Sequence, residues 1–207
     1  MRRAFLRQLT RSIKSRTSLA RVDQGEIAQQ TDTYLSANEH LAKTSVERLH
    51  VETVCLVLAA NDYLTGHAID DETVEAILED AVLKPGRRIT RWATRIMLAL
   101  SRDPMATLVR YSSDKIPPAY GSLFEFEEEG SERDTYTMRA TRCFYHEFFT
   151  RYQVPHLTRI FCRWDEAWIE PISVDRHGVQ FTRSETIATG GQSCPFTFRR
   201  SPKRAGD

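Results

Sequence analysis

Apolar positions in the first half of the chain recur with the spacing of helices. From about residue 37 to residue 64 they form a face broad enough for a core helix, and Gly66 is a natural stop. A second helix is predicted to end at Pro85-Gly86, and a third to run from about Arg88 to Leu100. The third is expected to turn these residues inward: Ile89, Trp92, Ala93, Ile96, Met97 and Leu100.

The pattern changes after Ile116-Pro117-Pro118. Two alternating runs, Ser122–Glu127 and Thr135–Ala140, flank a charged turn with Gly130 and predict a β-hairpin. Further on, the pattern predicts two helices and then two short strands: Phe144–Tyr152, a helix opening at Pro155, Gly178–Ser184 and Cys194–Arg200. The predicted fold is α+β, with an N-terminal helical half followed by a small, mostly antiparallel sheet of about four strands with two helices.

These elements divide the chain into four stretches. Residues 1–22 form a basic N-terminal tail or helix, with a targeting segment or an interface helix as further interpretations. Residues 23–115 are helical and residues 116–200 are the α+β portion, expected to form one integrated domain with them. Residues 201–207 are a polar tail.

The composition bears on three questions: a nucleic-acid partner, a membrane span and the cellular location. The net charge of +1 over 207 residues gives no reason to expect a nucleic-acid partner. The longest apolar run, Val54–Ala60, is far short of the roughly 20 residues of a membrane span. Four cysteines without a visible secretory signal favour free thiols and a cytoplasmic location. A homo-oligomer remains compatible with the sequence.

Residues able to carry chemistry concentrate between Thr141 and Arg200. Cys143 falls where a strand is predicted to meet a helix, close to His146. Cys194 follows Gly190-Gly191, whose missing side chains would let the backbone approach a ligand. Either thiol is a candidate nucleophile if a nearby charge or base activates it.

A second group accompanies these thiols. Cys162 and Asp165 are three residues apart on a predicted helix and so share a face, where the carboxylate suits a general base. Arg183 and Arg142 are the alternative candidates to hold a substrate carboxylate by a two-pronged hydrogen bond. Each cysteine taken alone is better explained as a packing residue than as a catalytic one. No cofactor is predicted; a zinc ion held by the three thiolates, with His146 or Asp165 as fourth ligand, is an alternative without the tight C-x-x-C spacing.

Three segments together resemble the L-2-amino-thiazoline-4-carboxylic acid hydrolase family. They are R-C-F-Y-H-E-F-F from Arg142, P-H-L-T-R-I-F-C-R-W-D-E-A-W from Pro155 and F-T-R-S-E-T-I-A-T-G-G-Q-S-C-P-F-T-F from Phe181. The resemblance covers about Ala140 to Arg199. It implies a hydrolase that opens a cyclic, amidine-like ring of a small heterocyclic acid, with water adding to the carbon between sulfur and nitrogen and the ring thiol leaving.

The resemblance also implies roles for particular residues. Cys143 or Cys194 is the expected nucleophile, Asp165 the base or water-positioning group, and Arg183 the holder of the substrate anion. The remaining candidates are catalytic Cys162 and His146, and substrate-binding Thr186, Gly190, Gly191 and Trp168. Two alternatives stay open: a non-catalytic module that binds or senses a small molecule, and a family member recruited to another biosynthetic transformation.

Overall fold

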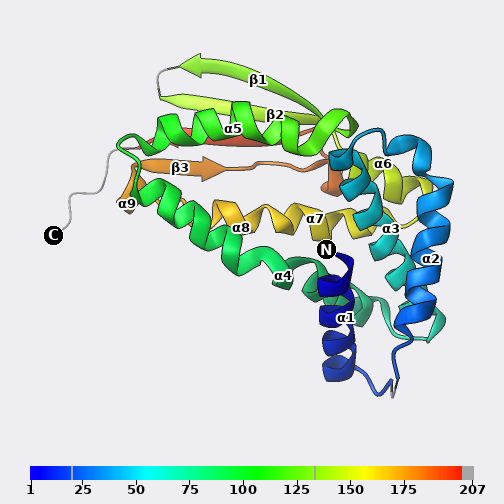
Figure 1. Ribbon diagram of the computed structural model, residues 1–207. Helices are drawn as coiled ribbons and strands as arrows, with labels where there is room; N and C mark the ends of the chain where they lie inside the picture. Colours follow the sequence, from blue (N-terminus) through cyan, green and yellow to red (C-terminus); the bar gives the residue numbers. More distant parts are fainter. Residues whose placement is uncertain (20, 133, 202–207) are drawn as a thin grey trace. The chain divides into compact units, whose positions relative to one another are not determined.

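The computed structural model describes residues 1–19, 21–132 and 134–201 (Figure 1). The chain divides into two compact units, one of Met1–Arg87 with Glu147–Trp164 and the other of Arg88–His146 with Asp165–Asp207. Nearly all of the predicted polar tail, residues 202–207, lies outside the described residues. The predicted fold class is confirmed: helices dominate the first half, and a four-stranded antiparallel sheet follows.

The first unit is helical. Capping side chains open two of its helices: Asp23 accepts from backbone N–H groups at the start of one, and Thr44 and Glu47 form a capping box at the start of another. The basic N-terminal segment forms a helix whose apolar residues, Leu9 and Ile13 among them, are buried. The helices with residues in this unit are α1 (Arg2–Arg16), α2 (Gln24–Ala37), α3 (Ser45–Gly66), α4 (Asp71–Ala99), α6 (Phe144–Arg151) and α7 (Thr158–Trp164).

One helix, α4, replaces the two that were predicted, so the predicted stop at Pro85-Gly86 is wrong. Gly86 does not adopt the positive φ of a helix-ending glycine. A Cβ atom there would lie 2.7 Å from the Trp164 ring, so the glycine serves close packing of that ring. Packing has overridden the local preference for a break.

The predicted orientation of the second half of α4 is also wrong. Ile89, Trp92 and Leu100 are 73%, 66% and 81% exposed, whereas Leu98 is 2% exposed and belongs to a buried cluster. Met97 is the member of the predicted inward set that packs, partly buried, against this cluster. Both arcs of the helix carry apolar residues, and periodicity alone cannot choose between them.

The second unit is built on one antiparallel sheet with strand order β1-β2-β4-β3. The strands are β1 (Glu125–Glu132), β2 (Thr135–Arg142), β3 (Val179–Thr182) and β4 (Cys194–Arg200). The predicted hairpin and the last strand are confirmed, but β1 begins later than predicted and includes Gly130, which was predicted to lie in the turn. Strand β3 is shorter than predicted. Helix α5 (Pro104–Tyr120) continues through Pro117-Pro118 and packs against β1, β2 and β4 (Figure 1).

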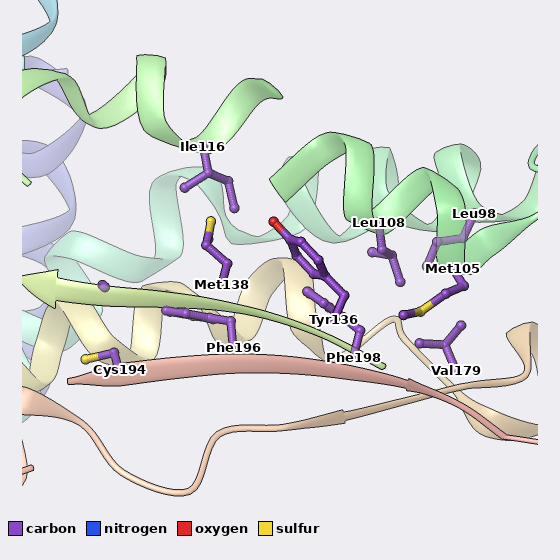
Figure 2. Close-up of a cluster of buried hydrophobic side chains, with 11 residues drawn as sticks. Leu98, Met105, Leu108, Ile116, Tyr136, Met138, Val179, Cys194, Phe196 and Phe198 are labelled. Atoms are coloured by element: carbon purple, nitrogen blue, oxygen red, sulfur yellow. The ribbon is translucent and has the colours of Figure 1, made fainter. Parts of the chain in front are cut away.

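Alternation decides which face of the sheet is buried. Tyr136 lies opposite Phe198, and Met138 opposite Phe196, and all four side chains enter the core between the sheet and α5 (Figure 2). Cys194 stands at one end of this row (Figure 2). The opposite face is polar, as illustrated by the 2.9 Å hydrogen bond between the hydroxyls of Thr137 and Thr197. The outer strand β1 carries an exposed run of glutamates.

Short elements complete the chain. They are η1 (Glu39–Leu41), η2 (Gly121–Leu123), η3 (Pro155–Leu157), α8 (Glu166–Ile169), α9 (Val174–His177) and η4 (Ile187–Thr189). Gly178 ends α9 with φ +64°, a left-handed conformation that glycine adopts without steric cost. Across the described ranges, no helix has both the length and the apolarity to cross a membrane.

Candidate active site

A buried ion pair lies at the centre of the second unit's candidate chemistry. Asp165 stands between α7 and α8, and Arg183 directly follows β3. Arg183 Nη1 donates to Asp165 Oδ2 at 2.9 Å, and the two side chains are only 16% and 14% exposed. The structure therefore brings together two of the residues that the sequence identified separately.

Aromatic rings surround this pair. The indole N–H of Trp168 donates to Asp165 Oδ1 at 3.4 Å, and the Arg183 guanidinium lies 5.5 Å from the centre of the Phe196 ring. Trp168 and Phe196 stack with their centroids 5.9 Å apart. Both charges are thus held against apolar walls, where water screens them little.

Burial sets the acidity of the aspartate. It raises the pKa of Asp165 to about 6, although the charge and the hydrogen bond of Arg183 and the hydrogen bond of Trp168 act in the opposite direction. Desolvation therefore outweighs the ion pair. A carboxyl group with a pKa near neutrality can take up and release a proton under physiological conditions, as a general base requires.

Two half-buried tyrosines lie in the same electrostatic environment. Burial raises the pKa of Tyr120 well above its usual range, and the charges of Asp165 and Cys143 raise it further. The pKa of Tyr145 is raised in the same way. Tyr120 and Tyr145 both contact the Phe124 ring, with centroids 4.8 and 5.0 Å away. At neutral pH both hydroxyls keep their protons and remain hydrogen-bond donors.

The two cysteines of this unit differ in environment. Cys194 is 8% exposed, its Sγ accepts the backbone N–H of Ile187 at 3.3 Å, and burial raises the pKa of its thiol. Cys194 is therefore a neutral thiol at pH 7. Cys143 is half-buried at the junction between β2 and α6, as predicted.

The glycine loop is a tight turn anchored to the sheet. Gly191 N–H donates to the Thr186 carbonyl at 3.0 Å, and Gly190 ends η4 with φ +90°. Ser193 donates to Glu185 at 3.0 Å and accepts from Arg139 of β2 at 3.0 Å. The loop thereby fixes the position of Ile187, the backbone partner of Cys194.

Replacing the two loop glycines is expected to have unequal effects. A Cβ at Gly191 would lie 2.9 Å from the Thr186 carbonyl oxygen, whereas nothing lies within 4 Å of one at Gly190. Gly191→Ala should lower the free energy of unfolding by about 2 to 3 kcal/mol, as overpacking does. Gly190→Ala should lower it by about 1 kcal/mol through its positive φ alone. Urea unfolding of both variants measures the difference; equal losses would contradict the close approach at Gly191.

Two further predicted residues lie on helices. Cys162 is on α7, among the residues of the first unit. His146 lies in the first turn of α6. Its Nδ1 atom is buried and has no hydrogen-bond partner among the described residues. Within the same residues, no three His, Cys, Asp or Glu side chains are grouped to hold a metal ion, so the zinc alternative gains no support.

Sequence reasoning missed three contributors, Tyr120, Tyr145 and Phe196. Phe196 is also a member of the buried core cluster, and Tyr120 lies at the C-terminal end of α5. Phe196 had a usable signal, since it is two residues after Cys194 on a strand and so points to the same face. Tyr120 had none, because its neighbours come from distant segments.

Comparison with known proteins gives one informative match. No curated protein matches the chain. Among solved structures, an Fe(II) unliganded H-NOX protein from K. algicida has 11% identity and a TM-score of 0.33, with 100% of this chain and 99% of that chain covered. A mutant of that protein has 11% identity and a TM-score of 0.32, with coverages of 99% and 98%.

The informative match is to a family model. The model for L-2-amino-thiazoline-4-carboxylic acid hydrolase covers residues 48–198, most of the chain. This range includes Cys143, Asp165, Arg183 and Cys194, and it extends the resemblance into the helical first half. The chain therefore belongs to the L-2-amino-thiazoline-4-carboxylic acid hydrolase family.

Proposed function

We propose that the protein is a hydrolase that opens a cyclic, amidine-like ring in a small heterocyclic acid. The observation that carries the proposal is the buried pair of Asp165 and Arg183, in which the pKa of the carboxyl group is raised to about 6. Membership of a family named for such a hydrolase supports the same reaction class. A thiazoline carboxylate is the substrate type that this family name indicates.

The proposed reaction begins with water. Asp165 takes a proton from a water molecule as its oxygen attacks the ring carbon between sulfur and nitrogen. The C=N π electrons move to nitrogen, which receives that proton from Asp165. Asp165 then takes the hydroxyl proton of the tetrahedral intermediate as the carbonyl forms and the carbon–sulfur bond breaks, and this second proton passes to the departing sulfur. One water is consumed, and the product is an N-carbamoyl amino acid with a free thiol.

Other residues support this step. Arg183, which donates to Asp165, has a planar guanidinium of the kind that binds a carboxylate through two parallel hydrogen bonds, and we assign the substrate carboxylate to it. The protonated phenols of Tyr120 and Tyr145 can donate to charge that develops on nitrogen or oxygen. Because burial raises the pKa of Cys194, we assign attack to water instead of to this thiol.

Turnover of a defined substrate tests the proposal. The purified protein is offered 2-amino-thiazoline-4-carboxylate, and release of thiol and N-carbamoyl product is followed by thiol titration and mass spectrometry. Product formation with full activity in Cys194→Ala is the expected result. A covalent adduct on Cys143, with loss of activity in Cys143→Ala, would replace water attack by thiol attack. Tight binding without turnover would instead indicate a binding module.

Changing Arg183 is expected to move the pH profile. The Arg183 charge and hydrogen bond lower the pKa of Asp165, so Arg183→Gln should raise that pKa above about 6. Asp165 would then stay protonated up to a higher pH. The acid limb of the kcat–pH profile should therefore move upward by about one pH unit, the size of shift that loss of an adjacent opposite charge produces. Arg176→Gln, at an exposed position in the same unit, is the matched control. An unmoved limb would show that Asp165 is not the group titrating.

A further inference from the structure

A strip of large apolar side chains is exposed along the second half of α4. Ile89, Trp92, Ile96 and Leu100 are 73%, 66%, 36% and 81% exposed. Their spacings of three and four residues place them on one face of the helix. We call these four residues the α4 strip. A contiguous apolar surface of this kind on a folded protein marks an interaction site.

The charged residues of the chain segment that carries the strip are all positive. From Ala81 to Arg102 the chain has six lysines and arginines and no acidic residue. On a helix of 3.6 residues per turn, Arg88 and Arg95 lie along one edge of the strip. Both are exposed, and within the described ranges neither forms an ion pair, whereas Arg91 reaches Glu170 at 3.0 Å. The surface is therefore apolar in the middle and cationic along one side.

A hollow continues the strip past the end of α4. It has a volume of about 450 Å³, and its lining includes Leu100, Arg102 and Arg110. Ser101 and Thr107, also in the lining, bond to each other through their hydroxyls at 2.7 Å. The one acid of the lining, Asp103, is engaged by Arg200 at 2.7 Å. Arginines and hydroxyl groups that line a hollow suit an anionic phosphate group.

We propose that the α4 strip docks on the surface of a bilayer that contains anionic phospholipid. Trp92 and the three aliphatic side chains would enter the boundary between headgroups and acyl chains, and Arg88, Arg95 and Arg102 would meet lipid phosphates. The hollow beside Leu100 would take one headgroup. The helix lies along the surface and does not cross it, in keeping with its many charges.

The charges and the apolar residues of this surface favour an anionic bilayer over two other partners. A second copy of the chain would bring the same arginine-lined strip against itself. The segment from residue 81 to residue 102 has no acid to offset the repulsion, and Glu170 and Asp103 beside it are already paired with Arg91 and Arg200. A nucleic acid would match the arginines but would leave Ile89, Trp92 and Leu100 without an apolar partner. An anionic bilayer complements both halves of the surface.

Vesicle binding tests this proposal with the full chain. Co-sedimentation compares phosphatidylcholine vesicles with and without phosphatidylserine, at low and at high salt. The expected result is binding that needs phosphatidylserine and weakens with salt, since surface charges are screened. The tryptophan emission should shift to the blue on binding, and Trp92→Phe should remove that shift, because Trp92 is the exposed indole that enters the boundary.

Two double variants test the apolar and the cationic parts of the surface separately. Trp92→Ser with Leu100→Ser should weaken binding by roughly tenfold or more, and Arg88→Gln with Arg95→Gln by roughly 25-fold. The matched controls are Leu49→Ser, at a 48% exposed position in the other unit, and Arg159→Gln, also exposed there. Both controls should bind as the unmodified chain does.

Four outcomes would overturn the proposal. They are absence of vesicle binding, equal binding without phosphatidylserine, equal losses in the control variants, and self-association that Leu100→Ser abolishes while no lipid is bound. The last would make the strip an interface between copies, which sedimentation velocity detects. Since every substituted side chain is exposed, thermal unfolding of the variants should match that of the unmodified protein.

Discussion

Asp165→Asn is expected to lower kcat/KM by about 10²- to 10⁴-fold, the range for loss of a general base. The amide keeps the size of the carboxyl group but cannot accept a proton from water. It also loses the charge that pairs with Arg183 at 2.9 Å. Steady-state turnover of a thiazoline carboxylate, followed by thiol release, measures the effect.

The pH dependence gives this prediction a second measurement. A base must be deprotonated to act, and the pKa of Asp165 is raised to about 6. The rate of the unmodified protein should therefore be near its maximum above pH 7 and fall about tenfold per pH unit below about 6. In Asp165→Asn the small residual rate should lose this limb. Asp175→Asn, at an exposed carboxylate of the same unit, is the control and should leave both rate and limb unchanged. A residual rate that keeps the limb would assign it to another group.

Phe198→Ala is expected to be the most destabilising of the substitutions considered, lowering the free energy of unfolding by about 3 to 5 kcal/mol. The Phe198 ring has no exposed surface and contacts the rings of Tyr136, Phe181 and Trp168. Truncation leaves a cavity between the sheet and α5 that neighbouring rings cannot fill without leaving their rotamers. Urea unfolding followed by tryptophan fluorescence measures the loss.

Two further variants serve as comparisons for that loss in the free energy of unfolding. Phe198→Leu keeps most of the apolar volume and should lose less than Phe198→Ala. Ile89→Ala removes an equally apolar side chain from a 73% exposed position and should change the free energy of unfolding by less than about 0.5 kcal/mol. If Phe198→Ala and Ile89→Ala had equal effects, the assignment of Phe198 to the centre of the core would be wrong.

How far sequence predicts this fold depends on whether local signals agree. In β4, alternation of Phe196 and Phe198 with polar residues gave the strand its correct bounds, because only one face is apolar. In α4, apolar residues occupy two arcs, and the choice between Leu98 and Trp92 as the inward residue depends on what packs against the helix. The effect of Gly86 likewise depends on Trp164, a residue far along the chain.

In the candidate site, too, some features follow from local sequence and others depend on distant residues. Asp165, Arg183 and Cys194 were identifiable because their residue types and motifs carry the resemblance. Their proximity was not, since Asp165 lies in a connection between two helices and Arg183 after a strand. The raised pKa of Asp165 and the presence of Tyr120 come from burial among distant segments, which sequence spacing does not reveal.

The order of the strands has a consequence for how the second unit folds. The β1–β2 hairpin pairs neighbours in sequence, but β4, from the end of the chain, lies between β2 and β3 and joins Thr137 to Thr197. Closing a loop of this length costs chain entropy before any contact is gained, so pairing of β4 is expected to be the slow step of folding. Phe196, Phe198 and Cys194 enter the core in that step. The core and the surroundings of Arg183 should therefore form together, late and cooperatively, and a trapped hairpin intermediate would have neither.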